Sequence, residues 1–201
     1  MTSTLVIIPA YNEEKNLPMV LEGLKRLQRE LDIDILVVDD GSQDRTYEVA
    51  RAHGVMVIRH ERNMGVEAAI QTGFKYAIER GYLYTVKIDA DGQHDPSDVP
   101  KLLRPLVEGV ADVTIGVRTA GYRELLLFKL GRLASSALIG FFLRRWLRDP
   151  TSGFKGRNLR AVALSRALYE RTRFLHDDIV NNIEENILYL RSGLESATAL
   201  R

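Results

Sequence analysis

The feature that most constrains the fold is a regular alternation between short apolar runs and segments whose apolar residues recur at helical spacing. This alternation fills the first 118 residues of the 201-residue chain. Short apolar runs are typical of buried strands, and helices between them allow neighbouring strands to run parallel. The sequence therefore predicts an α/β fold with a Rossmann-like, mostly parallel sheet flanked by helices. The predicted strands are residues 5–8, 33–38, 55–58, 82–88 and 113–117.

Capping and turn residues mark the predicted helix boundaries. Asn16 and Pro18 precede a segment with leucines at helical spacing, and Asp44 is suited to cap a second helix. Gly81 is placed to end a third helix, and Pro96 is placed to begin a fourth. Ligands of such sheets bind outside the carboxyl ends of the strands. The polar residues that follow each strand are therefore the candidate site residues.

Composition indicates one soluble globular domain and excludes several kinds of site. The chain has 28 Lys and Arg, 27 Asp and Glu, 45% hydrophobic residues and no cysteine. The lack of cysteine excludes a disulfide framework, a thiolate zinc site and a cysteine nucleophile. A net charge of +1 argues against nucleic acid as a partner. The first residues carry no basic leader and only a short apolar run, so we expect a cytoplasmic protein.

Residues 118–148, which we call the basic apolar segment, carry most of the charge asymmetry. They contain seven Lys and Arg and one Glu, among many Leu and Phe residues. Basic and apolar residues together are typical of a segment that lies on an anionic membrane surface. Its longest uncharged run has eleven residues, whereas a helix needs about 20 to cross a bilayer. An ordinary core helix with solvated cations is the alternative interpretation.

Two adjacent carboxylates, Asp39 and Asp40, follow the second predicted strand. Adjacent residues of an extended segment project in opposite directions, so at least one carboxylate faces the crevice at the sheet edge. That carboxylate can accept hydrogen bonds from a nucleobase or a ribose. The alternative is a turn followed by a helix cap, because Gly41 and Ser42 come next. Residues 9–14 similarly bring an aromatic ring, an amide and two carboxylates to the end of the first strand.

A second acidic cluster follows the fourth predicted strand. Asp89, Asp91 and Gln93 are spaced two apart, so an extended segment presents two carboxylates and an amide oxygen to one point. Oxygen ligands suit Mg²⁺ or Mn²⁺, which completes its coordination with water and phosphate. The cluster therefore predicts a metal site for a diphosphate-bearing ligand. No Walker-type loop or GxGxxG fingerprint is present, which argues against an ATPase or a dehydrogenase.

Two arginines are candidates for binding phosphate. Arg118 ends the fifth predicted strand at the same edge as the acidic clusters, and Arg132 lies in the basic apolar segment. The forked guanidinium group matches the geometry of phosphate oxygens. A solvated surface arginine is the alternative for either residue.

The ordered set of motifs resembles family 2 glycosyltransferases, and more narrowly the dolichyl-phosphate mannosyltransferase and polyprenyl-phosphate glycosyltransferase branch. The resemblance covers about residues 5–156. It rests on residues 6–13 (Val-Ile-Ile-Pro-Ala-Tyr-Asn-Glu), residues 37–42 (Val-Val-Asp-Asp-Gly-Ser) with Asp44 and Thr46, Asn63 with Gly65, residues 89–94 and residues 149–155.

The resemblance implies an A-type glycosyltransferase fold and a role for each matching residue. It implies that Asp89, Asp91 and Gln93 hold the metal. Catalytic roles would fall to Asp91, Arg118 and Arg132, with the two arginines facing the donor and acceptor phosphates. The nucleotide-sugar site would comprise Pro9, Tyr11, Glu13, Val38, Asp40, Asp89, Ala90, Asp91, Gln93 and Arg118.

The implied function is inverting, metal-dependent transfer of a hexose, with mannose favoured, from a nucleotide-diphosphate sugar to a polyprenyl or dolichyl phosphate. The donor would be GDP-mannose or a UDP-hexose, and the enzyme would act peripherally at the cytoplasmic face of a membrane. One alternative is a soluble glycosyltransferase with a carbohydrate hydroxyl acceptor, which needs a general base such as Asp149, Asp177 or Asp178. The other is a non-catalytic nucleotide-sugar-binding subunit.

We treat residues 1–201 as a single glycosyltransferase domain with three parts. A nucleotide-sugar-binding part spans about residues 1–118, and an amphipathic part facing the acceptor and the membrane spans about residues 119–148. The remaining part, about residues 149–201, is expected to be helical. Residues 196–201 lack an apolar run, so we expect no strand at this end of the sequence.

Overall fold

The computed structural model describes residues 3–116, 152–171, 185–189 and 192–199. Arg118, Arg132 and the whole of the basic apolar segment lie outside these ranges, as do the three candidate general bases. The elements are β1 (Thr4–Ala10), α1 (Leu17–Leu27), β2 (Ile33–Asp39), α2 (Thr46–Ala52), β3 (Met56–Arg59), α3 (Val66–Arg80), β4 (Tyr84–Lys87), the 3₁₀-helix η1 (Pro96–Asp98), α4 (Val99–Val107), β5 (Val113–Gly116), β6 (Lys155–Asn158), α6 (Leu159–Arg171) and β7 (Ser196–Ala199).

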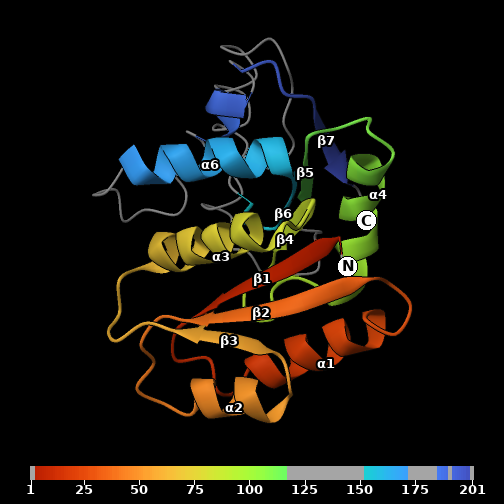
Figure 1. The fold of residues 1–201 in the computed structure, drawn as a ribbon. Coiled ribbons are helices and arrows are strands. Elements are labelled where there is room, and N and C mark those ends of the chain that lie inside the picture. Colours follow the sequence, from red (N-terminus) through yellow and green to blue (C-terminus); the bar gives the residue numbers. More distant parts are fainter. Residues whose placement is uncertain (1–2, 117–151, 172–184, 190–191, 200–201) are drawn as a thin grey trace, which may run out of the picture.

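The strands form one seven-stranded sheet in the order β3-β2-β1-β4-β6-β5-β7 (Figure 1). The pairs β1–β2, β1–β4, β2–β3 and β5–β7 are parallel, and β6 is antiparallel to both of its neighbours. Every predicted strand is present. The prediction of a mostly parallel α/β sheet is therefore confirmed.

Helices cover both faces of the sheet (Figure 1). One core cluster packs α1, α2 and α4 against alternate strand residues such as Val6 and Ile8. The intervening residues, Leu5 and Ile7, pack with α3 and α6 on the other face. Because both faces are buried, β1 and β2 consist mainly of consecutive apolar residues instead of alternating apolar and polar ones. None of the helices in the described ranges is long and apolar enough to cross a membrane.

The expectation that no strand forms near residue 196 is wrong. Residues 196–199 form β7, which pairs in parallel with β5. Just before β7, the carbonyl of Glu195 accepts a hydrogen bond from the Asp112 N–H (2.7 Å), and the Glu195 N–H donates to the Asp112 carboxylate (2.9 Å). Backbone pairing to an exposed sheet edge therefore forms this strand, although its Ser-Ala-Thr-Ala sequence has no apolar run.

The strand β6 was also not predicted, because its sequence is Lys-Gly-Arg-Asn. Lys155 and Arg157 are both buried, and both contact the fully buried carboxylate of Glu185 at 2.8–2.9 Å. The Tyr189 hydroxyl donates to the same carboxylate at 2.5 Å. Desolvation opposes ionisation of Glu185, but attraction to Arg157 and Lys155 outweighs it and lowers the pKa of this carboxyl. Tertiary charge compensation thus allows a polar strand in the interior.

Candidate functional site

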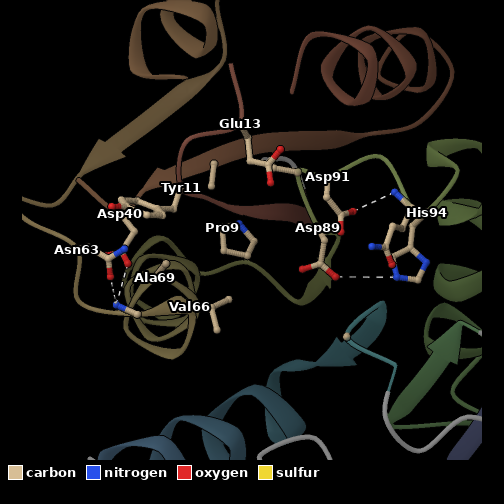
Figure 2. A pocket seen from close by; sticks show the side chains of 15 residues that line it. Pro9, Tyr11, Glu13, Asp40, Asn63, Val66, Ala69, Asp89, Asp91 and His94 are labelled. Carbon is tan, nitrogen blue, oxygen red and sulfur yellow. Dashed lines mark hydrogen bonds and ion pairs between the residues drawn. The ribbon is translucent and has the colours of Figure 1, made fainter. Parts of the chain in front are cut away.

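The loops that follow β1, β2 and β4 surround one cavity of about 490 Å³ at the carboxyl edge of the sheet, which we call the edge cavity. Its remaining walls come from the beginning of α3 and from Gly153, which lies just before β6. Figure 2 shows Tyr11, Asp40 and Asn63 toward one end and Asp89, Asp91 and His94 toward the other. The full lining comprises Pro9, Ala10, Tyr11, Glu13, Asp40, Asn63, Gly65, Val66, Ala69, Asp89, Ala90, Asp91, Gln93, His94 and Gly153.

The loop after β1 is held by side chains of the loop after β2. Asn12 has a φ of 55°, an uncommon left-handed conformation for a residue other than glycine. Its side-chain oxygen accepts a hydrogen bond from the Gln43 N–H at 2.9 Å. Three more hydrogen bonds join the loops. The Asn12 N–H donates to Ser42 Oγ (2.9 Å), and the Glu13 N–H donates to Thr46 Oγ1 (2.7 Å). The Glu14 N–H donates to Asp44 Oδ2 (3.1 Å). These bonds fix the backbone from which Tyr11 and Glu13 reach the edge cavity.

Asp44 occupies the position predicted for a helix cap, two residues before Thr46. Its carboxylate accepts hydrogen bonds from the backbone N–H and the hydroxyl of Thr46. Although desolvation favours the neutral acid, the hydrogen bonds from Thr46 and from the Glu14 N–H outweigh it and lower the pKa of Asp44. The carboxylate therefore holds α2 and the loop after β1 at the same time.

Asp39 and Asp40 project in opposite directions, as the sequence predicts. Asp39 is fully buried, forms an ion pair with Arg59 (3.0 Å) and accepts a hydrogen bond from the Ser42 N–H. Only Asp40 lines the edge cavity. Gly41 between them has a φ of 71°, and a Cβ there would lie 2.5 Å from the backbone carbon of Arg62. Glycine is therefore required at position 41 for both backbone conformation and space.

The Asp40 carboxylate organises the loop that leads into α3. It accepts hydrogen bonds from the N–H groups of Met64 (3.0 and 3.1 Å) and Gly65 (2.7 Å). His60 Nδ1 lies 2.7 Å from Asp40 Oδ1, and His60 Nε2 lies 2.9 Å from Thr72 Oγ1. Asp40 thus shapes one end of the edge cavity, and its carboxylate is already engaged by the protein.

The second acidic cluster lines the other end of the edge cavity. Asp89 forms an ion pair with Lys87 at 2.6 Å, and His94 Nε2 lies 3.9 Å from the second Asp89 oxygen. Asp91 accepts a hydrogen bond from the backbone N–H of Gln93 at 2.9 Å. The His94 ring stacks on Phe154, with ring centroids 4.9 Å apart. His94 and Phe154, which are far apart in the sequence, therefore meet at this end.

The structure brings most of the sequence-predicted site residues together. All of Pro9, Tyr11, Glu13, Asp40, Asp89, Ala90, Asp91 and Gln93 line the edge cavity. Val38 is the exception, because its side chain is fully buried in the core beside α3. Arg118 and Arg132 lie outside the described residues.

Several lining residues were not predicted as site residues. Asn63, Gly65, His94 and Gly153 belong to the motifs that carry the family resemblance, which is the signal that could have identified them. Ala10 continues the β1 motif. Val66 and Ala69 lie in the first turn of α3. Their part in the cavity arises because α3 begins at its edge.

The donor atoms at Asp89, Asp91 and Gln93 fit a divalent cation that is only partly held by protein. Within the described ranges, no group of three or more His, Cys, Asp and Glu side chains is arranged to hold a metal ion. Mg²⁺ is commonly held by one or two carboxylates, and substrate phosphates and water supply its other ligands. Two carboxylates and one amide at the same cavity match this pattern, so a bound diphosphate would complete the site.

Comparison with solved structures identifies the same architecture. The chain resembles the crystal structure of glucosyl-3-phosphoglycerate synthase from Mycobacterium tuberculosis in complex with Mn²⁺ and UDP-glucose, with a TM-score of 0.71 and 24% identity. The match covers 98% of this chain and 69% of the other. The likeness shows the A-type glycosyltransferase fold that the sequence resemblance implied.

Sequence comparisons agree with this fold. UDP-N-acetylglucosamine–dolichyl-phosphate N-acetylglucosaminyltransferase of Methanococcus voltae is 33% identical, with 75% of this chain and 67% of the relative covered. Polyprenol monophosphomannose synthase of Mycolicibacterium smegmatis is 36% identical, with 76% and 60% covered. The chain spans 44% to 69% of the length of the curated relatives considered. The family model for glycosyl transferase family 2 matches residues 5–195, and the chain therefore belongs to that family.

Proposed function

We propose that this protein transfers a hexose from a nucleotide-diphosphate sugar to a polyprenyl or dolichyl phosphate. The observation that carries the proposal is the edge cavity, which has Asp40 and Tyr11 toward one end and the pair Asp89 and Asp91 toward the other. A nucleoside and a metal-bound diphosphate need these two environments side by side. The names of the two relatives support a lipid-phosphate acceptor, and they differ in the sugar named. We favour mannose as the sugar, with GDP-mannose or a UDP-hexose as the donor.

We assign the nucleoside to the end of the edge cavity near the loops after β1 and β2. There Pro9 and Tyr11 offer an apolar surface, Glu13 offers carboxylate oxygens, and Asp40 forms part of the wall through its hydrogen bonds to the loop before α3. Val38 would take part through the backbone of β2, since its side chain is buried in the core. Because hydrogen bonds between the loops already fix this region, binding the nucleoside would require little reordering of the chain.

We assign the diphosphate and its divalent cation to Asp89, Ala90, Asp91 and Gln93. A cation held there, Mg²⁺ or Mn²⁺, would stabilise the negative charge that develops on the departing nucleoside diphosphate. Arg118 would act on the same charge, and Arg132 would hold the acceptor phosphate. The protein would orient the acceptor for attack from the face of the sugar opposite the leaving group, which inverts the anomeric carbon.

A lipid phosphate acceptor relaxes the chemical demands on the protein. The second pKa of a phosphate monoester is about 6, so this nucleophile is largely ionised at neutral pH and needs no general base. A carbohydrate hydroxyl would need one. Asp40 and Asp89 of this cavity are engaged by His60, Lys87 and backbone N–H groups, which is compatible with the phosphate acceptor.

A donor and acceptor screen tests the proposal. The purified chain is incubated with GDP-mannose, UDP-glucose or UDP-N-acetylglucosamine, with Mg²⁺ or Mn²⁺ and a short polyprenyl phosphate, and nucleoside diphosphate release is measured. We expect release that requires both the cation and the lipid phosphate. Release with a carbohydrate acceptor alone would support the hydroxyl-acceptor enzyme, and donor binding without release would support a binding subunit.

We further propose that the basic apolar segment brings the protein to the cytoplasmic face of a membrane. Replacing Arg144, Arg145 and Arg148 with Gln is expected to weaken binding to vesicles that contain anionic lipid, because each cation near such a surface contributes about 1 kcal/mol. Wild-type binding should fall as salt is raised, since screening weakens surface attraction. Co-sedimentation with vesicles measures both effects. Equal binding by the wild type and the triple variant would favour the core-helix interpretation.

A further inference from the structure

Lys87, the last residue of β4, is a charged residue in the interior of the sheet. Its side chain is 2% exposed, and its ammonium group lies 2.6 Å from Asp89 Oδ1. Its neighbours along the strand, Thr85 and Val86, are also buried. Burying an ammonium group is costly unless a counter-charge compensates it. The Asp89 carboxylate, two residues ahead in the chain, supplies such a counter-charge.

Gly153 packs against this ion pair. A Cβ at position 153 would lie 2.3 Å from Lys87 Nζ and 3.1 Å from Asp89 Oδ2, so only glycine fits without moving the pair. Gly153 and Asp89 also line the same cavity. The next residue, Phe154, stacks on His94, whose Nε2 lies 3.9 Å from Asp89 Oδ2. The ion pair is thus packed between two segments that are distant in sequence.

Two lysines lie opposite each other on β4 and β6, and each forms an ion pair with a different carboxylate. Lys155 lies opposite Lys87 in the register of β4 and β6, but its ammonium group pairs with Glu185 at 2.9 Å. Lys87 therefore compensates Asp89. Asp91, by contrast, forms no ion pair with any residue in the described ranges. The two acidic residues of the cluster consequently carry different effective charge.

We propose that Lys87 is a positioning residue that fixes the Asp89 carboxylate and cancels its charge, with Gly153 holding the pair in place. This inference rests on the proposed function. A nucleotide diphosphate is itself strongly anionic, and two uncompensated carboxylates would repel it. With Lys87 present, the cavity binds the diphosphate together with its cation, because the repulsion by Asp89 is cancelled. Without Lys87, it would favour the bare cation and disfavour the diphosphate.

The test is Lys87→Met, which keeps the length of the side chain and removes its charge. We expect Mn²⁺ alone to bind about tenfold more tightly, because one nearby positive charge is lost. We expect UDP and GDP in the absence of metal to bind about tenfold more weakly for the same reason. Electron paramagnetic resonance of free Mn²⁺ and calorimetric titration of the nucleotides measure the two affinities. A merely structural role would lower both.

Three further variants complete the experiment. Lys87→Met combined with Asp89→Asn restores the net charge and should bind Mn²⁺ no more tightly than the wild type. Gly153→Ala displaces the ammonium group, so it should strengthen Mn²⁺ binding and weaken nucleotide binding, as expected for Lys87→Met. If Lys87→Met does not fold, Gly153→Ala tests the inference in its place. Lys75→Met is the matched control, because Lys75 is 61% exposed and lies on α3, and it should change neither affinity.

Two results would overturn the inference alone: a parallel loss of both affinities in folded Lys87→Met, or tighter Mn²⁺ binding that persists in the double variant. A wild-type chain that binds neither Mn²⁺ nor nucleotide would instead overturn the proposed function, and the inference with it.

Discussion

Replacing Glu185 with alanine is expected to lower the free energy of unfolding by about 3–5 kcal/mol, because it leaves buried cations without their counter-charge. The carboxylate is fully buried and contacts both Lys155 and Arg157. Those residues form β6, which joins β4 to β5 in the middle of the sheet. The variant should therefore lose the carboxyl-terminal part of the sheet first. Urea unfolding followed by circular dichroism measures the loss.

A matched control is Glu108→Ala. Glu108 pairs with Arg104 at 2.8 Å, but both side chains are largely exposed, so the midpoint of unfolding should not move measurably. Equal midpoints for the wild type and Glu185→Ala would show that the buried cluster does not stabilise the fold.

The same carboxylate predicts a pH dependence. Since the folded protein lowers the pKa of Glu185 below its ordinary value of 4.5, its contribution to stability is complete above that pH and is lost as the pH falls further. The stability difference between the wild type and Glu185→Gln should therefore narrow on acidification from pH 6 to pH 3. A difference that stays constant over this range would contradict the charge compensation.

Asp91→Ala is expected to reduce metal-dependent turnover by about 10²- to 10³-fold, the size of effect seen when one group that stabilises transition-state charge is removed. Asp91 lines the edge cavity and forms no ion pair within the described part of the chain. It is therefore the carboxylate best placed to hold the cation, and donor affinity in the presence of Mn²⁺ should fall with turnover. Nucleoside diphosphate release and donor titration measure the two effects.

Asp32→Ala is the control for Asp91→Ala. Asp32 is an exposed carboxylate between α1 and β2, at the opposite edge of the sheet from the cavity. It should leave both turnover and donor affinity unchanged. Wild-type turnover in Asp91→Ala would remove Asp91 from the role that we assign to it.

The parts of the fold that were predictable are those that apolar residues determine. β1 and β2 are buried on both faces, so their uninterrupted apolar runs are visible in the sequence. β6 and β7 contain no such runs. Glu185 compensates the charges of Lys155 and Arg157 on β6, and β7 is held by backbone pairing with β5. Neither partner is adjacent in sequence, so no local pattern could indicate these strands.

The same reasoning separates what was predictable in the site. The alternation of an extended segment correctly placed Asp39 and Asp40 on opposite sides. It could not show that the Asp40 carboxylate accepts hydrogen bonds from Met64 and Gly65, because these residues lie in the loop after β3. Lys87 was missed for a similar reason. A lysine at the end of a strand ordinarily reaches solvent, whereas this one is buried, pairs with Asp89 and packs against Gly153.

The hydrogen bonds that join the loops after β1 and β2 also limit how such a protein can be redesigned. Each loop supplies the partners of the other, through Asn12 and Gln43 and through Glu13 and Thr46. Replacing one of these loops with that of another enzyme would leave polar atoms of the retained loop without their hydrogen-bond partners. Changing the base that we propose this site binds therefore calls for exchanging the two loops as a single unit.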